Sequence, residues 1–194
     1  APAVVVEGAV LAAREYNVEV LLVGQQEAIN EDLGKYNPGK GKIEIVSASQ
    51  VIAMDESPAE AIRRKRDSSI AVAARLLKNG DATAMVSAGN TAAALAISRS
   101  ILGKLKGIAR PAIATIMPNL TDNTILLDVG ANAGSCKPEH FLEFAIMGEV
   151  YAKDVMGKQN PSVGLLSIGE EQSKGSVITL EAFPLLKNAP INFV

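Results

Sequence analysis

Short apolar segments and helix-forming segments alternate along almost the whole of this 194-residue chain. Strands that alternate with helices favour a parallel sheet, because parallel strands need a crossover between them. The composition agrees: 48% of the residues are hydrophobic but only 4% are aromatic, so the apolar residues are mainly aliphatic. Aliphatic strands are typical of a sheet buried on both faces. We therefore expect a doubly wound α/β sheet.

The expected elements follow from periodicity and from helix start and stop signals such as Pro2 and Gly80. The expected helices are 2–16, 27–36, 57–79, 91–102, 138–156 and 177–188, the last interrupted by Pro184. The seven expected strands are 18–24, 42–48, 82–88, 112–118, 124–130, 162–169 and 191–194. We expect one α/β domain over residues 1–194, and the missing initiator Met and the strand-like end indicate a piece of a longer chain, incomplete at both ends.

Charge, cysteine content and hydropathy exclude several classes of protein. The 19 basic and 21 acidic residues give a net charge of −2, which argues against nucleic acid as a partner. The single cysteine, Cys136, rules out an internal disulfide and fits a reducing compartment. It lies beside Lys137, which could lower its thiol pKa, although an ordinary cytosolic thiol is the simpler interpretation. His140 is the single histidine, so no metal site is expected. The sequence contains no run of 18 apolar residues, the length that a membrane-spanning helix needs.

The turn Ser87-Ala88-Gly89-Asn90-Thr91 joins an expected strand to an expected helix. Ligands of such sheets bind outside the carboxyl ends of the strands. Gly89 would let a ligand approach the backbone, Asn90 and Thr91 offer donors, and the start of the helix favours a phosphate. An alternative interpretation makes Thr91 a helix N-cap and Gly89 only a tight turn.

Two further turns lie at expected strand ends. Asp128, Gly130 and Asn132 lie at the end of one strand, and the two polar side chains could orient a donor or simply cap the loop. Lys174 is the one cation in "GEEQSKGS", residues 169–176. It could act as a mobile ammonium facing an anion, or be a solvated loop lysine.

Two familiar motifs are incomplete and a third is absent. "GKYNPGKG" (34–41) has glycine where a P-loop needs Ser or Thr, and it precedes a strand. No G-x-G-x-x-G is present, which disfavours a nicotinamide dehydrogenase. "MVSAG" resembles a nucleophile elbow without its first glycine, and the order Ser87, Asp128, His140 is that of α/β-hydrolases. A thioester hydrolase therefore remains a rival hypothesis.

Four cations stand together at Arg63, Arg64, Lys65 and Arg66. Such a run is usually a solvated helix face. Beside a phosphate pocket it could also attract an acidic carrier protein, so these residues are candidates for carrier docking.

Six stretches, in order along the chain, resemble the phosphate acyltransferase family of bacterial phospholipid synthesis. They are "PAEAIRRKRDSS", "VSAGNTAA", "KGIARPAIAT", "LLDVGANAGSCKPEHF", "AIMGEVYAKDVMG" and "VGLLSIGEEQSKG". The resemblance implies a three-layer α/β/α, mostly parallel sheet, similar to that of isopropylmalate dehydrogenases and phosphotransacetylases, in a homodimer. Ser167 and Ser176 stand where the family usually has asparagine.

The family's reaction moves a fatty acyl group from acyl carrier protein (ACP) to inorganic phosphate, giving acyl phosphate for phosphatidic acid synthesis without a cofactor or metal. The resemblance implies a cytoplasmic location, a downstream glycerol-3-phosphate acyltransferase, and peripheral membrane contact through a segment outside this chain. The catalytic candidates are Lys174, which matches the lysine of the family's acyl-transfer centre, Asn132 and His140. The substrate- and phosphate-binding candidates are Ser87, Gly89, Asn90, Thr91, Asp128, Gly130 and Lys137. A non-catalytic carrier-binding or scaffold protein of the same fold is the main alternative.

Overall fold

The computed structural model describes residues 2–37, 42–130, 136–169 and 174–194. The chain divides into two compact units, Ala1–Gly103 and Lys104–Val194, and we describe each by itself. The expectation of a single domain stays a prediction.

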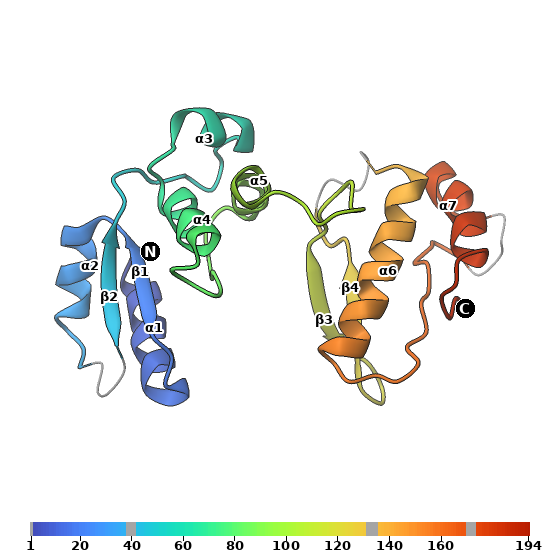
Figure 1. The fold of residues 1–194 in the computed structure, drawn as a ribbon, viewed down its shortest axis with the longest axis horizontal. Helices are drawn as coiled ribbons and strands as arrows, with labels where there is room; N and C mark the ends of the chain where they lie inside the picture. Colours follow the sequence, from blue (N-terminus) through green and yellow to red (C-terminus); the bar gives the residue numbers. More distant parts are fainter. Residues whose placement is uncertain (1, 38–41, 131–135, 170–173) are drawn as a thin grey trace. The chain divides into compact units, whose positions relative to one another are not determined.

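The first unit contains a two-stranded parallel sheet and five helices among its described residues (Figure 1). The strands are β1 (Val20–Gly24) and β2 (Ile43–Ser47). The helices are α1 (Pro2–Tyr16), α2 (Gln26–Leu33), α3 (Pro58–Arg64), α4 (Ser69–Asn79) and α5 (Thr91–Leu102). The expected helix over 57–79 is therefore two helices, because the chain turns at Lys65–Ser68 and Ser68 begins α4 as a new N-cap.

Two hydrophobic clusters hold the first unit together. One joins Val6 of α1, Leu22 of β1 and Ile29 of α2, so the helices on either side of β1 in sequence share one face of the sheet. The other packs α3, α4 and α5 together, and its most buried members are small: Ala61, Ala74 and Ala93. Small side chains let these three helices approach one another closely. The second cluster therefore fixes the start of α5.

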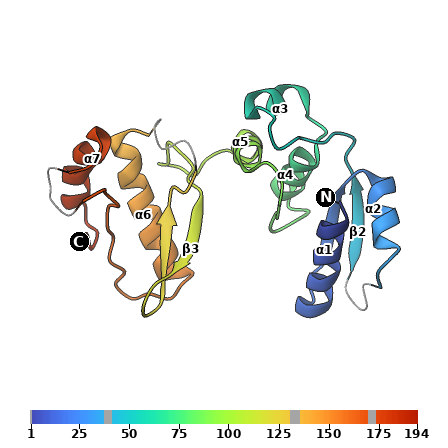
Figure 2. The ribbon, with the colours of Figure 1, turned by 180° about the vertical axis from the view of Figure 1, so that it is seen from behind.

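The second unit is a β-hairpin covered by a long helix. Its elements are β3 (Ala114–Pro118), β4 (Asn123–Leu127), α6 (Pro138–Asp154) and α7 (Val177–Lys187). Both views of the ribbon show α6 lying along the hairpin (Figures 1 and 2). Gly148 allows this close packing, since a Cβ there would lie 3.2 Å from Cδ1 of Leu127. Unlike β1 and β2, β3 and β4 are antiparallel, because the short connection 119–122 can join only antiparallel neighbours.

Three expected strands do not form in the described structure. Residues 82–88 are irregular, and the Val86 side chain is 97% exposed. In residues 162–169 and 191–194, the only β-pairing is one bridge between Val163 and Phe193. A strand requires a hydrogen-bonded neighbour, and an apolar run indicates burial without specifying that neighbour. Mixed α/β architecture is confirmed.

Pro184 lies inside α7, as the sequence predicted, and is exposed. Proline cannot donate to the carbonyl four residues earlier and its ring crowds that carbonyl. We expect Pro184→Ala to raise the free energy of unfolding by about 1–3 kcal/mol, because alanine restores the bond and loses no packing. Urea denaturation of the purified chain measures this change. Glu181→Ala, at another exposed position of α7, is the matched control and should stay within about 0.5 kcal/mol. Unchanged or lower stability for Pro184→Ala would contradict the expectation.

Candidate functional site

Asn90 is the N-cap of α5 and is only 5% exposed. Its Oδ1 accepts a hydrogen bond from the N–H of Ala93 at 2.9 Å. The alternative prediction that Thr91 is the cap is therefore wrong, because the helix begins one residue earlier than that prediction requires. Thr91 is the first helical residue and is exposed.

The Asn90 amide nitrogen ties α5 to a loop more than thirty residues away in sequence. Nδ2 donates to the carbonyl oxygens of Ala53 at 3.1 Å, Met54 at 3.2 Å and Glu56 at 3.0 Å. Both amide hydrogens are thus used inside the protein. Any anion at this turn would bind the first-turn backbone amides and the Thr91 hydroxyl, while Asn90 holds those groups in place.

The neighbours of Asn90 fit a ligand contact. The Ser87 hydroxyl accepts a hydrogen bond from the N–H of Gly89 at 3.3 Å, and both residues are exposed. A Cβ on Gly89 would meet only the Ser87 Oγ, at an ordinary 3.6 Å. The protein's own packing therefore does not require glycine at this position, whereas a ligand lying against the backbone would.

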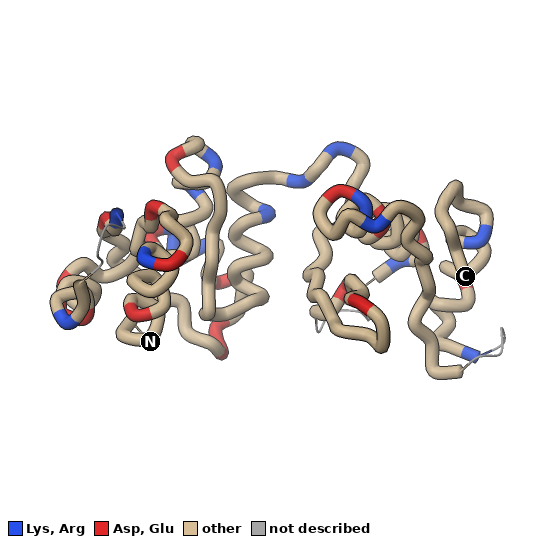
Figure 3. Tube along the Cα trace, turned by 90° about the horizontal axis from the view of Figure 1, so that it is seen from below, with Lys and Arg blue, Asp and Glu red and all other residues tan. Residues whose placement is uncertain are grey.

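The four residues of the basic run lie around the end of α3, and they do not share one role. The side chain of Arg64 is 80% exposed, with Nη1 at 4.0 Å from Oε1 of Glu60. Arg63 Nε donates to the carbonyl of Ala59 at 3.2 Å. Lys65 turns inward, and its Nζ donates to Oε2 of Glu56 at 2.5 Å. Arg66 is exposed. Basic and acidic positions are interspersed along the trace of both units (Figure 3).

In the second unit, Asp128 organises the turn that follows β4. Its Oδ1 accepts hydrogen bonds from the N–H groups of Ile113 and Gly130, each at 3.2 Å. A Cβ on Gly130 would lie 3.1 Å from that same oxygen, so a larger residue here would displace the carboxylate by a few tenths of an ångström. The Asp128 carboxylate therefore holds the backbone of this turn in place. Asn132 lies outside the described residues.

Lys137 and His140 meet at the start of α6. The N–H of Lys137, the N-cap residue, donates to Nδ1 of His140 at 3.0 Å. Because Nδ1 accepts, a neutral imidazole there carries its proton on Nε2. The preceding Cys136 is buried, and burial raises the pKa of its thiol, with Asp128 raising it further and Arg110 opposing the shift. The suggestion that Lys137 lowers this pKa is therefore wrong.

Lys174 is exposed directly before α7. Its carbonyl accepts a hydrogen bond from the Ser167 hydroxyl at 3.2 Å. Gly175, with φ of +135°, must be glycine, because a Cβ would lie 2.5 Å from Oγ1 of Thr179. Ser176 then caps α7 by accepting from the N–H of Thr179 at 3.3 Å. Ser and Asn cap helices equally well, which explains serine at 176.

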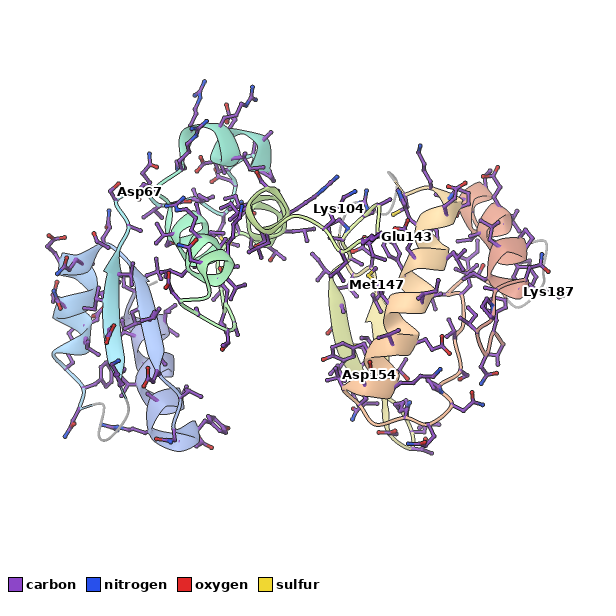
Figure 4. The ribbon with its side chains drawn as sticks, in the orientation of Figure 1. Asp67, Lys104, Glu143, Met147, Asp154 and Lys187 are labelled. Carbon is purple, nitrogen blue, oxygen red and sulfur yellow. The ribbon has the colours of Figure 1, made fainter. Side chains whose placement is uncertain are left out.

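A second carboxylate, that of Glu143 in α6, was not singled out from the sequence. Its Oε2 accepts from the N–H groups of Ala109 and Arg110 at 2.9 and 3.3 Å. Figure 4 shows Glu143 beside the segment that carries Lys104, whose ammonium donates to the Ala109 carbonyl. The stretch "KGIARPAIAT" contains Ala109 and Arg110 and could have drawn attention to them. Glu143 thus fixes the segment that leads into β3.

Other site types find little support in the described residues. Among them, no three His, Cys, Asp or Glu side chains gather closely enough to hold a metal ion. Within the same ranges, no helix combines the length and the apolar character needed to cross a bilayer. A hollow of about 430 Å³ at the carboxyl ends of β1 and β2 is lined by residues 25–28 and 47–49, none of which is a candidate from the sequence.

We expect Asn90→Ala to lower the free energy of unfolding by about 2–4 kcal/mol, from a lost cap and lost bonds to the loop. Ser68→Ala is the matched control, because Ser68 caps α4 through the N–H of Ala71 alone and should cost about 1 kcal/mol. Urea denaturation compares the two variants. Equal costs would mean that the bonds to the loop contribute nothing.

Comparison with known proteins finds a family model and several relatives that match the chain over its whole length. A model of the family described as "Fatty acid synthesis protein" matches residues 1–194. The chain is 50% identical, over its whole length, to a phosphate acyltransferase of Desulfitobacterium hafniense, and it covers 58% of that protein. It is 53% identical to the phosphate acyltransferase of Moorella thermoacetica and covers 57% of it. The chain thus spans under three fifths of the length of these relatives. With the family model matched from the first residue to the last, the chain belongs to the fatty acid synthesis protein family.

Proposed function

We propose that this chain forms part of a phosphate acyltransferase that moves a fatty acyl group from ACP to inorganic phosphate. A phosphate oxygen bonds to the thioester carbon, the carbon–sulfur bond breaks, and the carrier leaves as a thiol after taking up a proton. The products are acyl phosphate and free carrier. Such a reaction needs positioned reactants and stabilised charge, without a covalent intermediate on the enzyme.

The observation that carries this proposal is the turn at the start of α5. Asn90 holds it rigidly through four hydrogen bonds, Gly89 leaves its backbone bare, and Thr91 is exposed beside it. A helix start with bare backbone and a hydroxyl is suited to a phosphate group. The phosphate acyltransferase names of the relatives support inorganic phosphate as the substrate.

Further candidates from the sequence are assigned roles in the same reaction. Lys174 would offset the negative charge that grows on the carbonyl oxygen, with Asn132 as a further donor. The Nδ1 atom of His140 accepts from the backbone N–H of Lys137, so His140 would present Nε2–H to the departing sulfur or to the thioester carbonyl oxygen. Lys137 would add positive charge for the phosphate, and Asp128 and Gly130 would shape the turn.

The wider assignment follows the same family. We infer a three-layer α/β/α sheet in the complete protein, a homodimer, a cytoplasmic location with peripheral membrane contact, and a glycerol-3-phosphate acyltransferase as the consumer of the product. Arg63, Arg64 and Arg66 are exposed and would attract the acidic carrier.

The reaction is tested by incubating the full-length gene product with acyl-ACP, with and without radiolabelled inorganic phosphate. We expect acyl phosphate and free carrier only when phosphate is present. Carrier binding without turnover would support a scaffold protein. Thioester loss without phosphate would support a hydrolase, and in that case Ser87→Ala should abolish it. Our proposal predicts that Ser87→Ala retains substantial activity and that no acyl-serine can be trapped.

Lys174→Ala in the full-length protein should lower kcat by about 10²–10³, the usual effect of removing one preorganised charge-stabilising donor. Lys187→Ala is the matched control, because Lys187 is an exposed lysine in the last turn of α7 (Figure 4). Its kcat should be unchanged. Circular dichroism checks that both variants fold. Near-normal kcat for Lys174→Ala at saturating phosphate would remove the main cation from the mechanism.

A further inference from the structure

Lys65 differs from the arginines around it because its charge is used inside the protein. Its Nζ donates to the carbonyl of Val51 and to Oε2 of Glu56, both at 2.5 Å. The side chains of Lys65 and Glu56 are 28% and 17% exposed, against 80% for Arg64. A neutralised ammonium that faces inward adds little to the field that would attract an acidic partner.

Glu56 closes the loop formed by residues 51–57 onto itself. Its Oε2 also accepts from the N–H of Ala53 at 3.2 Å, and the Glu56 N–H donates back to the Ala53 carbonyl. The hydrogen bond from Lys65 holds the pKa of the Glu56 carboxyl below its ordinary value, so the group is ionised at neutral pH. Charge-assisted bonds of this kind are stronger than neutral ones.

The 51–57 loop is therefore held from two sides. The Lys65–Glu56 pair holds it from the end of α3, and the Asn90 amide holds it from the start of α5. The three carbonyls that Asn90 binds all belong to this loop, which fixes the side chain that caps α5. A loop freed from Lys65 would leave Asn90, and with it the first turn of α5, less well ordered.

We propose that Lys65 and Glu56 are positioning residues that hold the 51–57 loop against Asn90 and so keep the phosphate-binding turn of α5 in its binding geometry. This inference rests on the proposed function of that turn. It replaces the expectation that Lys65 docks the carrier protein, and leaves that role to the exposed arginines.

The kinetic test compares Lys65→Met with Arg64→Met in the full-length protein. For Lys65→Met we expect KM for phosphate to rise about tenfold, as for the loss of one charge-assisted hydrogen bond, while KM for acyl-ACP stays unchanged. For Arg64→Met we expect KM for acyl-ACP to rise while KM for phosphate stays unchanged. Lys65→Arg can still donate to both oxygens and should stay within about threefold of the wild type. A rise in KM for acyl-ACP alone with Lys65→Met would overturn the proposal in favour of docking.

Hydrogen exchange tests the same device without relying on activity. In Lys65→Met, the amides of Ala53, Glu56 and Ala93 should exchange about tenfold faster, whereas Lys78→Met, at an exposed lysine of α4, should leave them unchanged. Glu56→Gln should act like Lys65→Met, and the double variant should show less than the summed effect. Unchanged exchange in Lys65→Met would overturn the proposal even in an active enzyme. If the wild type forms no acyl phosphate, the proposed function fails, and the exchange rates alone decide whether the loop is held as described.

Discussion

The side chain of Asn90 connects two parts of the first unit that are separate in sequence, the start of α5 and the 51–57 loop. One oxygen caps α5, and one nitrogen binds three carbonyls of the 51–57 loop, which Lys65 and Glu56 hold from the other side. The carbonyls of this irregular loop need hydrogen-bond donors because the loop has no strand or helix partner. The buried Asn90 amide supplies two donor hydrogens from a single nitrogen. The position of the α5 start, and hence of the bare backbone at Gly89, depends on this residue.

The second unit uses carboxylates for the same purpose. Asp128 binds the backbone amides of Ile113 and Gly130, and Glu143 binds those of Ala109 and Arg110. Asp128 joins two separate backbone segments, and Glu143 binds two neighbouring amides of one segment. These amides lie outside strands and helices and so need a side chain as their hydrogen-bond acceptor. In both units, side chains that the sequence offers as ligand groups act first as supports for backbone. In our proposal, the groups that meet a ligand are backbone amides, the Thr91 hydroxyl, the Lys174 ammonium and the imidazole of His140.

Local signals predicted the helices well, because a helix satisfies its own hydrogen bonds. Pro2 and Gly80 occupy the start of α1 and the end of α4 as expected. Strands were predicted less well, since residues 82–88 and 162–169 carry the apolar pattern of strands, yet in the described structure they form no strand beyond one bridge from Val163 to Phe193. The inward turn of Lys65 could not be predicted from a run of four cations, because its partners lie up to fourteen residues away in an irregular loop.

The central claim, that phosphate binds at the first turn of α5, is tested most directly by nuclear magnetic resonance. Inorganic phosphate is titrated into the ¹⁵N-labelled full-length protein, and each amide resonance is followed. The account predicts that the largest saturable shifts belong to the N–H groups of Thr91 and Ala92, because first-turn amides have no intrahelical acceptor. Shifts centred instead on residues 25–28, at the start of α2, with Thr91 and Ala92 unchanged, would contradict it.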